Sequence, residues 1–382
     1  MKSVDIAIVG GGIIGCAIAF ELARRKAGSI LLVEKELLLG TGATAKCAGG
    51  IRAQFSTEVN SRVSQLAEDI FMNFEDEFGV PATYEKVGYL FCISTEEQEQ
   101  AFRKQLSMWQ SLGLPAEWLT PDDILKRIPM LEAGDLRGGT FCSTDGIADP
   151  GEYMTGYEKL ARELGVTIRS GDPVTDVGTK GNRVKSITVG NEEIAAGIVI
   201  NCAGPYAAGI GAMVGVDIPV QPFRRQICKT APLDWLPEDM PMIVDVKSGL
   251  YMHRESGGVL MGWGDPDVDV GFDMSNDPNY TDEIIMRALD RMPKLEVAEI
   301  THSWGGLYET TPDHNSIVGP VKTLEGFWNC VGFSGHGFMH APAMGRLMAE
   351  WMVDGQPSID LSALALERFA EPSKLQVEAN VI

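Results

Sequence analysis

The N-terminal thirty residues constrain the fold of this chain most. Residues 4–9 (VDIAIV) form a short, apolar, β-branched run, which predicts a buried strand. Residues 13–25 predict a helix, and residues 29–34 (SILLVE) predict a second buried strand. A strand–helix–strand unit of this length requires a parallel strand pair joined by a right-handed crossover. We therefore expect an α/β architecture.

The turn between the first strand and the helix has the spacing GxGxxG, formed by Gly10, Gly12 and Gly15. Glycines at these places permit a tight turn, close approach of a pyrophosphate and close helix packing. The helix start offers free N–H groups and the positive end of a dipole to the phosphates. Glu34 ends the second strand, where its carboxylate can accept two hydrogen bonds from a ribose diol. The pattern predicts a dinucleotide site without deciding between NAD and FAD.

The rest of the chain contains two kinds of region, one helical and one rich in short strands. Long helices are expected at residues 58–78, 94–112, 150–164 and 338–353. Residues 216–306 are instead richer in short alternating strands. The alternation of these regions along the sequence indicates two interleaved lobes rather than consecutive domains.

Composition excludes several classes of partner. Lys and Arg total 32 against 53 Asp and Glu, a formal charge of −21, and the chain has no basic run. Nucleic acids and anionic membranes both require clustered cations, so neither is expected as a partner. No apolar stretch reaches the ~20 residues that a transmembrane helix needs. Seven cysteines without a CxxC pair, and histidines without metal-ligand spacing, predict neither disulfides nor a metal site and fit a cytoplasmic protein.

Two glycine-rich segments favour FAD over NAD. Residues 40–52 are mostly small, so their backbone can pass beneath a flat ring system. Residues 332–339 (GFSGHGFM) follow an expected strand and open a helix, whose N–H groups would point at an anionic centre. A reduced flavin ring carries such a negative charge.

Four motifs in order carry a resemblance to a known family: IVGGGIIG with Glu34, GATAKCAGGIR, NCAGPYA, and LYETTPDHNSIVG followed by VGFSGHGFMHAPAMG. The chain resembles the D-amino-acid oxidase superfamily of FAD enzymes. Within it, the chain is most similar to the sarcosine oxidase branch and to the β subunits of dye-linked L-proline dehydrogenase. The resemblance implies a Rossmann-like FAD domain, a mostly antiparallel sheet over the substrate, and oxidation of an amine by hydride transfer to the flavin. We expect an α/β (α+β) chain with a discontinuous FAD-binding domain at 1–80, 145–215 and 305–365 and a substrate domain at 81–144 and 216–304.

The resemblance also implies which residues contact FAD. They are Gly10, Gly12, Ile13, Ile14, Gly15, Glu34, Lys35, Thr44, Lys46, Cys47, Ala48, Gly49, Gly50, Val174, Cys202, Ala203, Gly204, Gly306, Gly335, His336, Gly337, Phe338 and Met339. Some relatives bind FAD covalently, through a Cys at the position of Gly306 or a His at the position of Lys46. Because neither residue type stands there, non-covalent FAD is expected.

The substrate site is implied in the same way. The sarcosine branch binds the substrate carboxylate with an Arg that matches Arg52 and a Lys whose position is Met339 here, so a less polar pocket suited to a ring such as that of proline is expected. Glycine and D-amino-acid oxidases carry an Arg where this chain has Tyr308. We expect catalytic roles for Arg52, Tyr251 and His336, and substrate contacts from Arg52, Tyr251, His253, Tyr308 and Met339. Arg225 is a second candidate cation. Core packing for Tyr251 and a backbone hydrogen bond for His336 are equally open.

The position of Leu260 bears on the electron acceptor. In monomeric sarcosine oxidase the matching residue is a Lys that activates oxygen, and its loss favours a dehydrogenase. We expect a small secondary or N-methyl amino acid as substrate, and a dye, an electron carrier or a second flavoprotein subunit as acceptor. The alternatives are an oxidase or dehydrogenase for a D-amino acid, glycine or a 2-hydroxy acid, and a non-catalytic flavin subunit of an electron-transfer complex.

Overall fold

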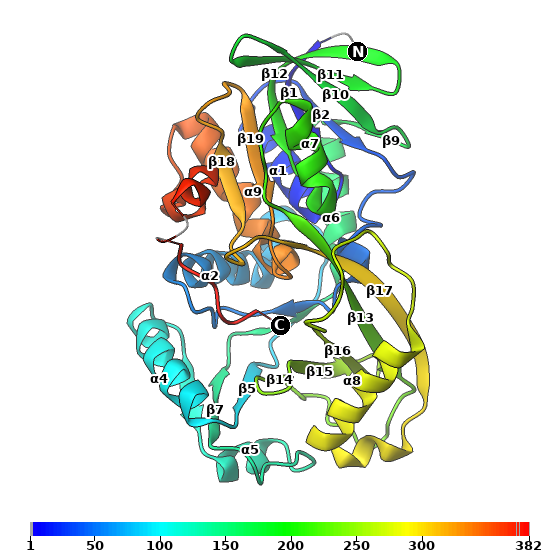
Figure 1. Cartoon of the computed structure of the whole chain (residues 1–382), viewed down its shortest axis with the longest axis vertical. Coiled ribbons are helices and arrows are strands. Elements are labelled where there is room, and N and C mark those ends of the chain that lie inside the picture. The colour runs from blue at the N-terminus through cyan, green and yellow to red at the C-terminus, as the bar shows by residue number, and fades with distance from the viewer. Residues whose placement is uncertain (1–2, 372, 374, 382) are drawn as a thin grey trace.

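The computed structural model describes residues 3–371, 373 and 375–381, and the chain folds into two halves, each built on a sheet (Figure 1). The upper sheet in Figure 1 has the order β10-β11-β12-β1-β2-β9, with β19 pairing β12 and β18 pairing β19. Its strands are β1 (Ser3–Val9), β2 (Ile30–Glu34), β9 (Thr167–Ser170), β10 (Val174–Lys180), β11 (Arg183–Val189), β12 (Glu192–Asn201), β18 (Ile317–Pro320) and β19 (Phe327–Val331).

The centre of this sheet is parallel, as the N-terminal pattern predicts. Strand β1 pairs in parallel with β2 on one side and with β12 on the other. Helix α1 (Ile13–Arg24) connects β1 to β2, and most of its residues are buried because α6 (Pro150–Glu163) and α9 (Gly337–Asp354) pack against it. A helix covered from several sides can be apolar around most of its circumference, which explains its uniform run of Ile, Ala, Cys and Phe.

The lower sheet has the order β17-β13-β16-β15-β14-β5-β7-β6, and β14 and β5 form its one parallel pair among the described residues. Its strands are β5 (Tyr89–Ile93), β6 (Ala116–Leu119), β7 (Gly138–Cys142), β13 (Gln221–Thr230), β14 (Met242–Asp245), β15 (Leu250–Glu255), β16 (Gly258–Trp263) and β17 (Ile300–Thr310). Alternate side chains face opposite ways. Val259 and Met261 pack toward α5 (Pro121–Arg127) and α8 (Pro278–Arg291), whereas Leu260 packs on the face of Tyr251 and α4 (Glu96–Ser111).

Short elements join the halves. A small sheet contains β3 (Gly50–Ile51), β8 (Gly146–Ala148) and β4 (Tyr84–Glu85), and α7 (Ala207–Met213) follows β12. Single 3-10 turns occupy Thr44–Lys46, Gly204–Tyr206, Pro293–Val297, Ser362–Leu364 and Leu366–Ala370. The strands of the upper sheet fall within the expected FAD-binding ranges, whereas β17 crosses the expected boundary at 304/305 because it pairs with β13 over its whole length. The division into domains stays a prediction.

Two expected helix boundaries differ from the structure. The helix expected at 58–78 is interrupted, giving α2 (Glu58–Met72) and α3 (Phe74–Phe78). Asn73 leaves helical geometry between them, and its side-chain amide donates to the carbonyl oxygen of Asp69 at 2.7 Å. The helix expected at 94–112 begins in the sequence with Ser94-Thr95-Glu96-Glu97, which has the pattern of a capping box from Ser94 to Glu97. In the structure the capping box lies one residue later, where Thr95 and Gln98 cap each other's backbone N–H groups.

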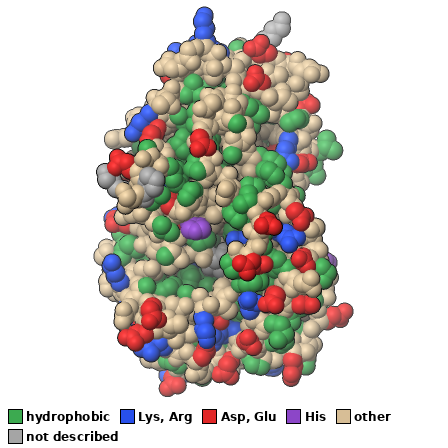
Figure 2. Space-filling view, viewed as in Figure 1, with side chains coloured by type: hydrophobic (Ala, Val, Ile, Leu, Met, Phe, Trp, Pro, Cys, Tyr) green, Lys and Arg blue, Asp and Glu red, His purple; other side chains and the backbone are tan. Residues whose placement is uncertain are grey.

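The surface carries the acidic charge in dispersed form. On the face shown in Figure 2, acidic and basic side chains are interspersed, and the surface is hollowed between the two halves. All seven cysteines are free thiols. Within the described ranges, the helices are too short or too polar to span a bilayer.

Candidate cofactor and substrate site

The turn after β1 is built so that only glycine fits at two of its three motif positions. Gly10 has φ +112°, and a Cβ there would collide with the carbonyl oxygen of Cys202. A Cβ at Gly15 would collide with the carbonyl oxygen of Gly10. Gly12 differs, because the nearest atom to its Cβ position is Thr44 Oγ1 at 3.5 Å. The turn therefore presents open backbone at Gly12, which is the face a pyrophosphate needs.

Helix α1 begins at this open face. Gly12 is its N-cap and offers no side-chain cap, so the N–H groups of Ile14 and Gly15 are available to a ligand. The hydroxyl of Thr44 accepts from Ile13 N at 3.2 Å, which fixes the 40–52 loop beside the helix start where Ile14 and Gly15 follow. This donor set suits the phosphates of FAD.

Glu34 is fixed where a ribose is expected. Its carboxylate accepts from Gly11 N at 2.8 Å and from Glu36 N at 2.9 Å, so it lies against the glycine turn. Each oxygen keeps a lone pair for a ribose hydroxyl. Lys35 points elsewhere, with its Nζ 4.4 Å from the centre of the Tyr206 ring.

The segment after β12 closes the other side of the turn. Cys202 N donates to Val9 O at 2.8 Å, which brings Cys202 and Ala203 against Gly10, and Gly204 follows with φ +55°. Val174 begins β10 and packs in a hydrophobic cluster with Leu31 and Val33. The contact of Val174 with FAD stays a prediction.

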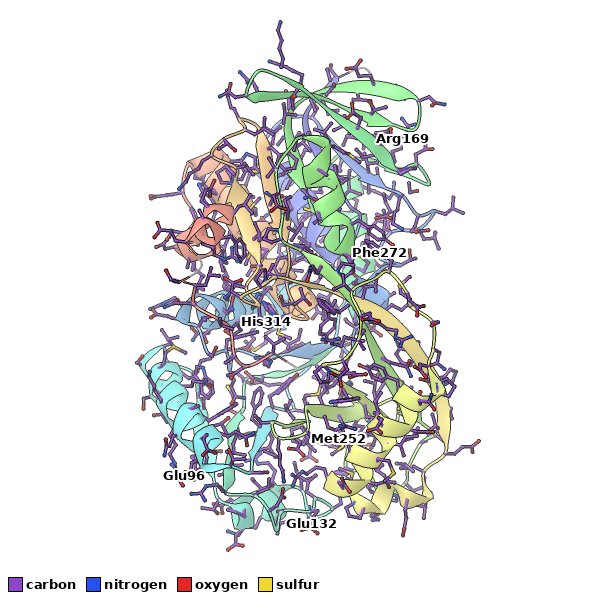
Figure 3. All side chains as sticks on the ribbon, in the orientation of Figure 1. Glu96, Glu132, Arg169, Met252, Phe272 and His314 are labelled. Atoms are coloured by element: carbon purple, nitrogen blue, oxygen red, sulfur yellow. The ribbon has the colours of Figure 1, made fainter. Side chains whose placement is uncertain are left out.

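A cavity lies between the two halves, at the level where Figure 3 labels His314. It brings together many of the expected residues: Cys47, Ala48, Gly49, Gly50, Arg52, Tyr251, Tyr308, Gly335, His336, Phe338 and Met339. Sequence analysis missed four further lining residues, which are Tyr89, Met242, Ser334 and Val381. Ser334 stands inside a recognised motif and could have been found there. Tyr89 and Met242 are opposite each other on β5 and β14, a long-range pairing that no local pattern reveals.

The start of α9 forms one wall of this cavity. His336 is the N-cap and makes no side-chain cap, so the N–H groups from Gly337 onward are available. Gly335 has φ +97°, and a Cβ there would collide with the Tyr308 ring. The positive end of the helix dipole thus faces the cavity beside the 47–50 backbone, as stabilisation of an anionic ring requires.

Arg52 brings a buried positive charge to the cavity wall. Its side chain is 3% exposed, and its guanidinium donates to the carbonyl oxygens of Gln54 (3.0 Å) and Asn380 and stacks 4.0 Å from the Phe55 ring centre. Its Nε has no hydrogen-bond partner in the described part of the chain. No carboxylate in the described residues forms an ion pair with it. A buried charge without a counter-charge is costly, so the site is complementary to an anionic group.

The other candidate side chains are neutral. Burial, and then the Arg52 guanidinium, hold the pKa of His336 well below its usual value, and its Nε2 has no partner among the described residues. Burial raises the pKa of both Tyr251 and Tyr308, whose hydroxyls face each other, so both stay protonated. His253 does not line the cavity: it is fully buried, and its Nδ1 lies 2.8 Å from Arg254 O.

The two positions at which relatives attach FAD lie against each other. A Cβ at Gly306 would lie 2.8 Å from Cβ of Lys46. The structure thus brings two sequence-distant positions to one place next to the cavity-lining residue Cys47.

The family model described as FAD dependent oxidoreductase (DAO) matches residues 5–351. Among solved structures, the chain is similar to L-proline dehydrogenase from P. horikoshii, with 30% identity, a TM-score of 0.91 and coverage of 97% of this chain and 98% of that one. It is 28% identical to FAD-dependent oxidoreductase domain-containing protein 1 of Xenopus laevis, over 99% of this chain and 85% of that protein. It is 24% identical to mitochondrial dimethylglycine dehydrogenase of Rattus norvegicus, over 96% of this chain but 45% of that protein's length.

These matches confirm the expected resemblance and the fold class. They also agree with the glycine turn, the uncapped starts of α1 and α9 and the position of Glu34, all of which suit FAD. The chain belongs to the DAO family of FAD-dependent oxidoreductases, which includes amino-acid and amine oxidases and dehydrogenases.

Proposed function

We propose that this chain oxidises the C–N bond of a small secondary or N-methyl amino acid, similar to proline or sarcosine, by hydride transfer to non-covalently bound FAD. The observation that carries the proposal is the buried Arg52 guanidinium at the wall of the cavity. Among the residues that the structure describes, its Nε has no partner and no carboxylate pairs with it. An amino-acid carboxylate supplies the missing charge. The similarity to a solved L-proline dehydrogenase supports the substrate class.

FAD would lie along the open backbone of Gly12, the start of α1 and the start of α9, with its ribose at Glu34. When bound, FAD supplies the acceptor for a hydride. The chain's own residues hold the substrate and exclude water. A charge-assisted pair between Arg52 and the substrate carboxylate fixes the substrate's orientation, since the guanidinium fork matches two carboxylate oxygens.

The remaining cavity wall supports an apolar ring. Met242, Phe338 and Met339 offer apolar contacts, and the Tyr251–Tyr308 pair closes the side of the lower sheet. Hydride removal requires the substrate amine to be neutral. Desolvation in this cavity lowers the amine pKa, so no dedicated base is needed. Neutral His336 adds no competing charge beside Arg52.

The proposed electron acceptor is an electron carrier, a partner flavoprotein subunit or an artificial dye rather than oxygen. Leu260 lies on the face of the lower sheet that carries Tyr251. Its cross-strand neighbour on β13 is Lys229, whose Nζ lies 4.0 Å from the Glu255 carboxylate, so that charge is paired. A cation near the reduced cofactor is the element that accelerates formation of superoxide.

Arg52→Ala should lower kcat/KM by at least about tenfold at unchanged FAD content, because a charge-assisted pair in a dry site is worth roughly 1.5–3 kcal/mol. Steady-state kinetics with a dye acceptor over L-proline, sarcosine, glycine and D-amino acids measures this. Arg62→Ala is the matched control, since Arg62 is exposed and pairs with Glu58 on α2. Near-native kcat/KM in Arg52→Ala would contradict the proposed anchor and direct attention to Arg225.

Acid precipitation of the purified protein should release all of its flavin into the supernatant. Gly306 has no side chain with which to form a bond, and Lys46 stands where a His is linked in some relatives. The flavin absorbance of the supernatant and of the pellet, read at about 450 nm, decides the question. Yellow colour retained by the washed pellet would contradict non-covalent binding.

A further inference from the structure

Two buried carboxyl groups lie behind the segment that carries Arg52. Asp145, between β7 and β8, is 0% exposed, and Glu68 on α2 is 3% exposed. Asp145 Oδ1 accepts from Ala53 N at 3.1 Å, and its Oδ2 accepts from Gln54 Nε2 at 2.9 Å. One carboxylate therefore holds both residues that follow Arg52.

Further hydrogen bonds connect Gln54 to two residues of the cavity wall. The carbonyl oxygen of Gln54 accepts from Arg52 Nη1 at 3.0 Å, and Gln54 Nε2 also donates to Tyr89 O at 3.1 Å. Arg52 and Tyr89 both line the cavity. Asp145 itself does not line it, so any effect of Asp145 on a substrate must pass through the 52–54 segment.

Burial raises the pKa of both carboxyl groups, and hydrogen-bond donors oppose the rise at Asp145. These donors are Ala53, Gln54 and the thiol of Cys142, whereas Glu68 Oε1 has no partner among the described residues. At Glu68, burial and then the neighbouring Asp145 charge raise the pKa well above its usual value. The shift favours the protonated form of Glu68, which has a proton to share with Asp145.

We propose that Asp145 is a positioning residue for substrate binding, which fixes the 52–54 segment so that the Arg52 guanidinium stays at the cavity wall. The inference rests on the proposed role of Arg52. Without the carboxylate, a buried N–H of Ala53 and the Gln54 amide lose their acceptor, so the segment must rearrange to satisfy them. A guanidinium displaced by such a rearrangement binds a carboxylate less well.

A double-mutant cycle tests this coupling. Asp145→Asn preserves volume but places an amide N–H group against the amide of Gln54. We expect KM for the amino acid to rise about tenfold with kcat within about twofold and FAD content unchanged, because binding rather than the chemical step is lost. In the Arg52→Ala background the same substitution should leave KM unchanged, since Asp145 acts through Arg52. The dissociation constant of tetrahydro-2-furoate, read from the flavin spectrum, should show the same pattern.

Asp69→Asn is the control, an exposed carboxylate next to Glu68 on α2. An unchanged KM in Asp145→Asn, or a further increase of KM in the Arg52→Ala background, would overturn the inference while leaving the proposed function intact. An unchanged KM in Arg52→Ala would instead contradict the proposed role of Arg52 as the carboxylate anchor, on which the inference rests. Where Asp145→Asn fails to fold or to retain FAD, Gln54→Ala enters the same cycle. If Gln54→Ala raises KM in the wild-type background but not in the Arg52→Ala background, the inference is supported. If Gln54→Ala leaves KM unchanged in the wild-type background, the inference is overturned.

Discussion

Gly12→Val should give a folded protein that contains no FAD. Gly12 has φ −75° and ψ −179°, an extended backbone that valine adopts without strain. Its Cβ position is free of close protein contacts, with Thr44 Oγ1 nearest at 3.5 Å. The added side chain therefore occupies the open face that the pyrophosphate needs, rather than the protein interior. Loss of this approach should abolish binding, because the phosphates bind to backbone N–H groups at contact distance.

The measurement is the ratio of flavin to protein absorbance after purification, together with a circular dichroism spectrum to show that the fold is intact. Gly209→Val is the control, since Gly209 is exposed on α7 and its Cβ position has no neighbour within 4 Å. A Gly12→Val protein with the wild-type flavin ratio would show that this turn does not bind the cofactor. Substitution of Gly10 or Gly15 would be less informative, because a Cβ at either place collides with backbone and threatens the fold itself.

The N-terminal unit could be predicted because its information is local. Strand, turn and helix follow one another in β1 and α1, and the glycines that the turn requires are the residues that define the motif. Helix ends were less accurate. The Thr95 cap lies one residue after the expected cap at Ser94, because both residues are hydroxyl caps and each has a suitable partner three positions later.

The candidate site was predicted only in part because it combines segments that are distant in the sequence. Arg52 and His336 lie in recognisable motifs, and the structure places both at the cavity. Asp145 acts on Ala53 across 92 positions of chain, and no periodicity indicates that pairing. His253 lies on the expected strand and on the same face as Tyr251, yet it does not line the cavity, because it is fully buried next to the Ala48 backbone. A period of two predicts which residues share a strand face, but not how far along the strand a ligand reaches.

Reoxidation of the substrate-reduced protein by oxygen should be slow, and Leu260→Lys should accelerate it. Leu260 is 4% exposed and packs in one cluster with Ala53, Tyr89 and Tyr251, of which the last two line the cavity. Oxygen reduction begins with one-electron transfer that forms superoxide, an anion that a nearby ammonium stabilises strongly in a site of low dielectric. Without that ammonium the activation barrier for electron transfer to oxygen should be higher by roughly 3–4 kcal/mol, which lowers the rate by about two to three decades.

Stopped-flow mixing of substrate-reduced protein with air-saturated buffer, and separately with a dye, measures both rates. The wild type should stay reduced for seconds in air and reoxidise quickly with the dye. In Leu260→Lys the rate of flavin reoxidation by oxygen should rise, whereas the uncharged control Leu260→Met should behave as the wild type. Burial lowers the pKa of an amine, and the cross-strand neighbour of Leu260, His253, is itself held neutral by burial. The gain from the lysine should therefore be largest at the acidic end of the working pH range, where more of the amine carries its proton. Wild-type reoxidation by oxygen that outpaces turnover with the dye would identify an oxidase and contradict the proposed acceptor.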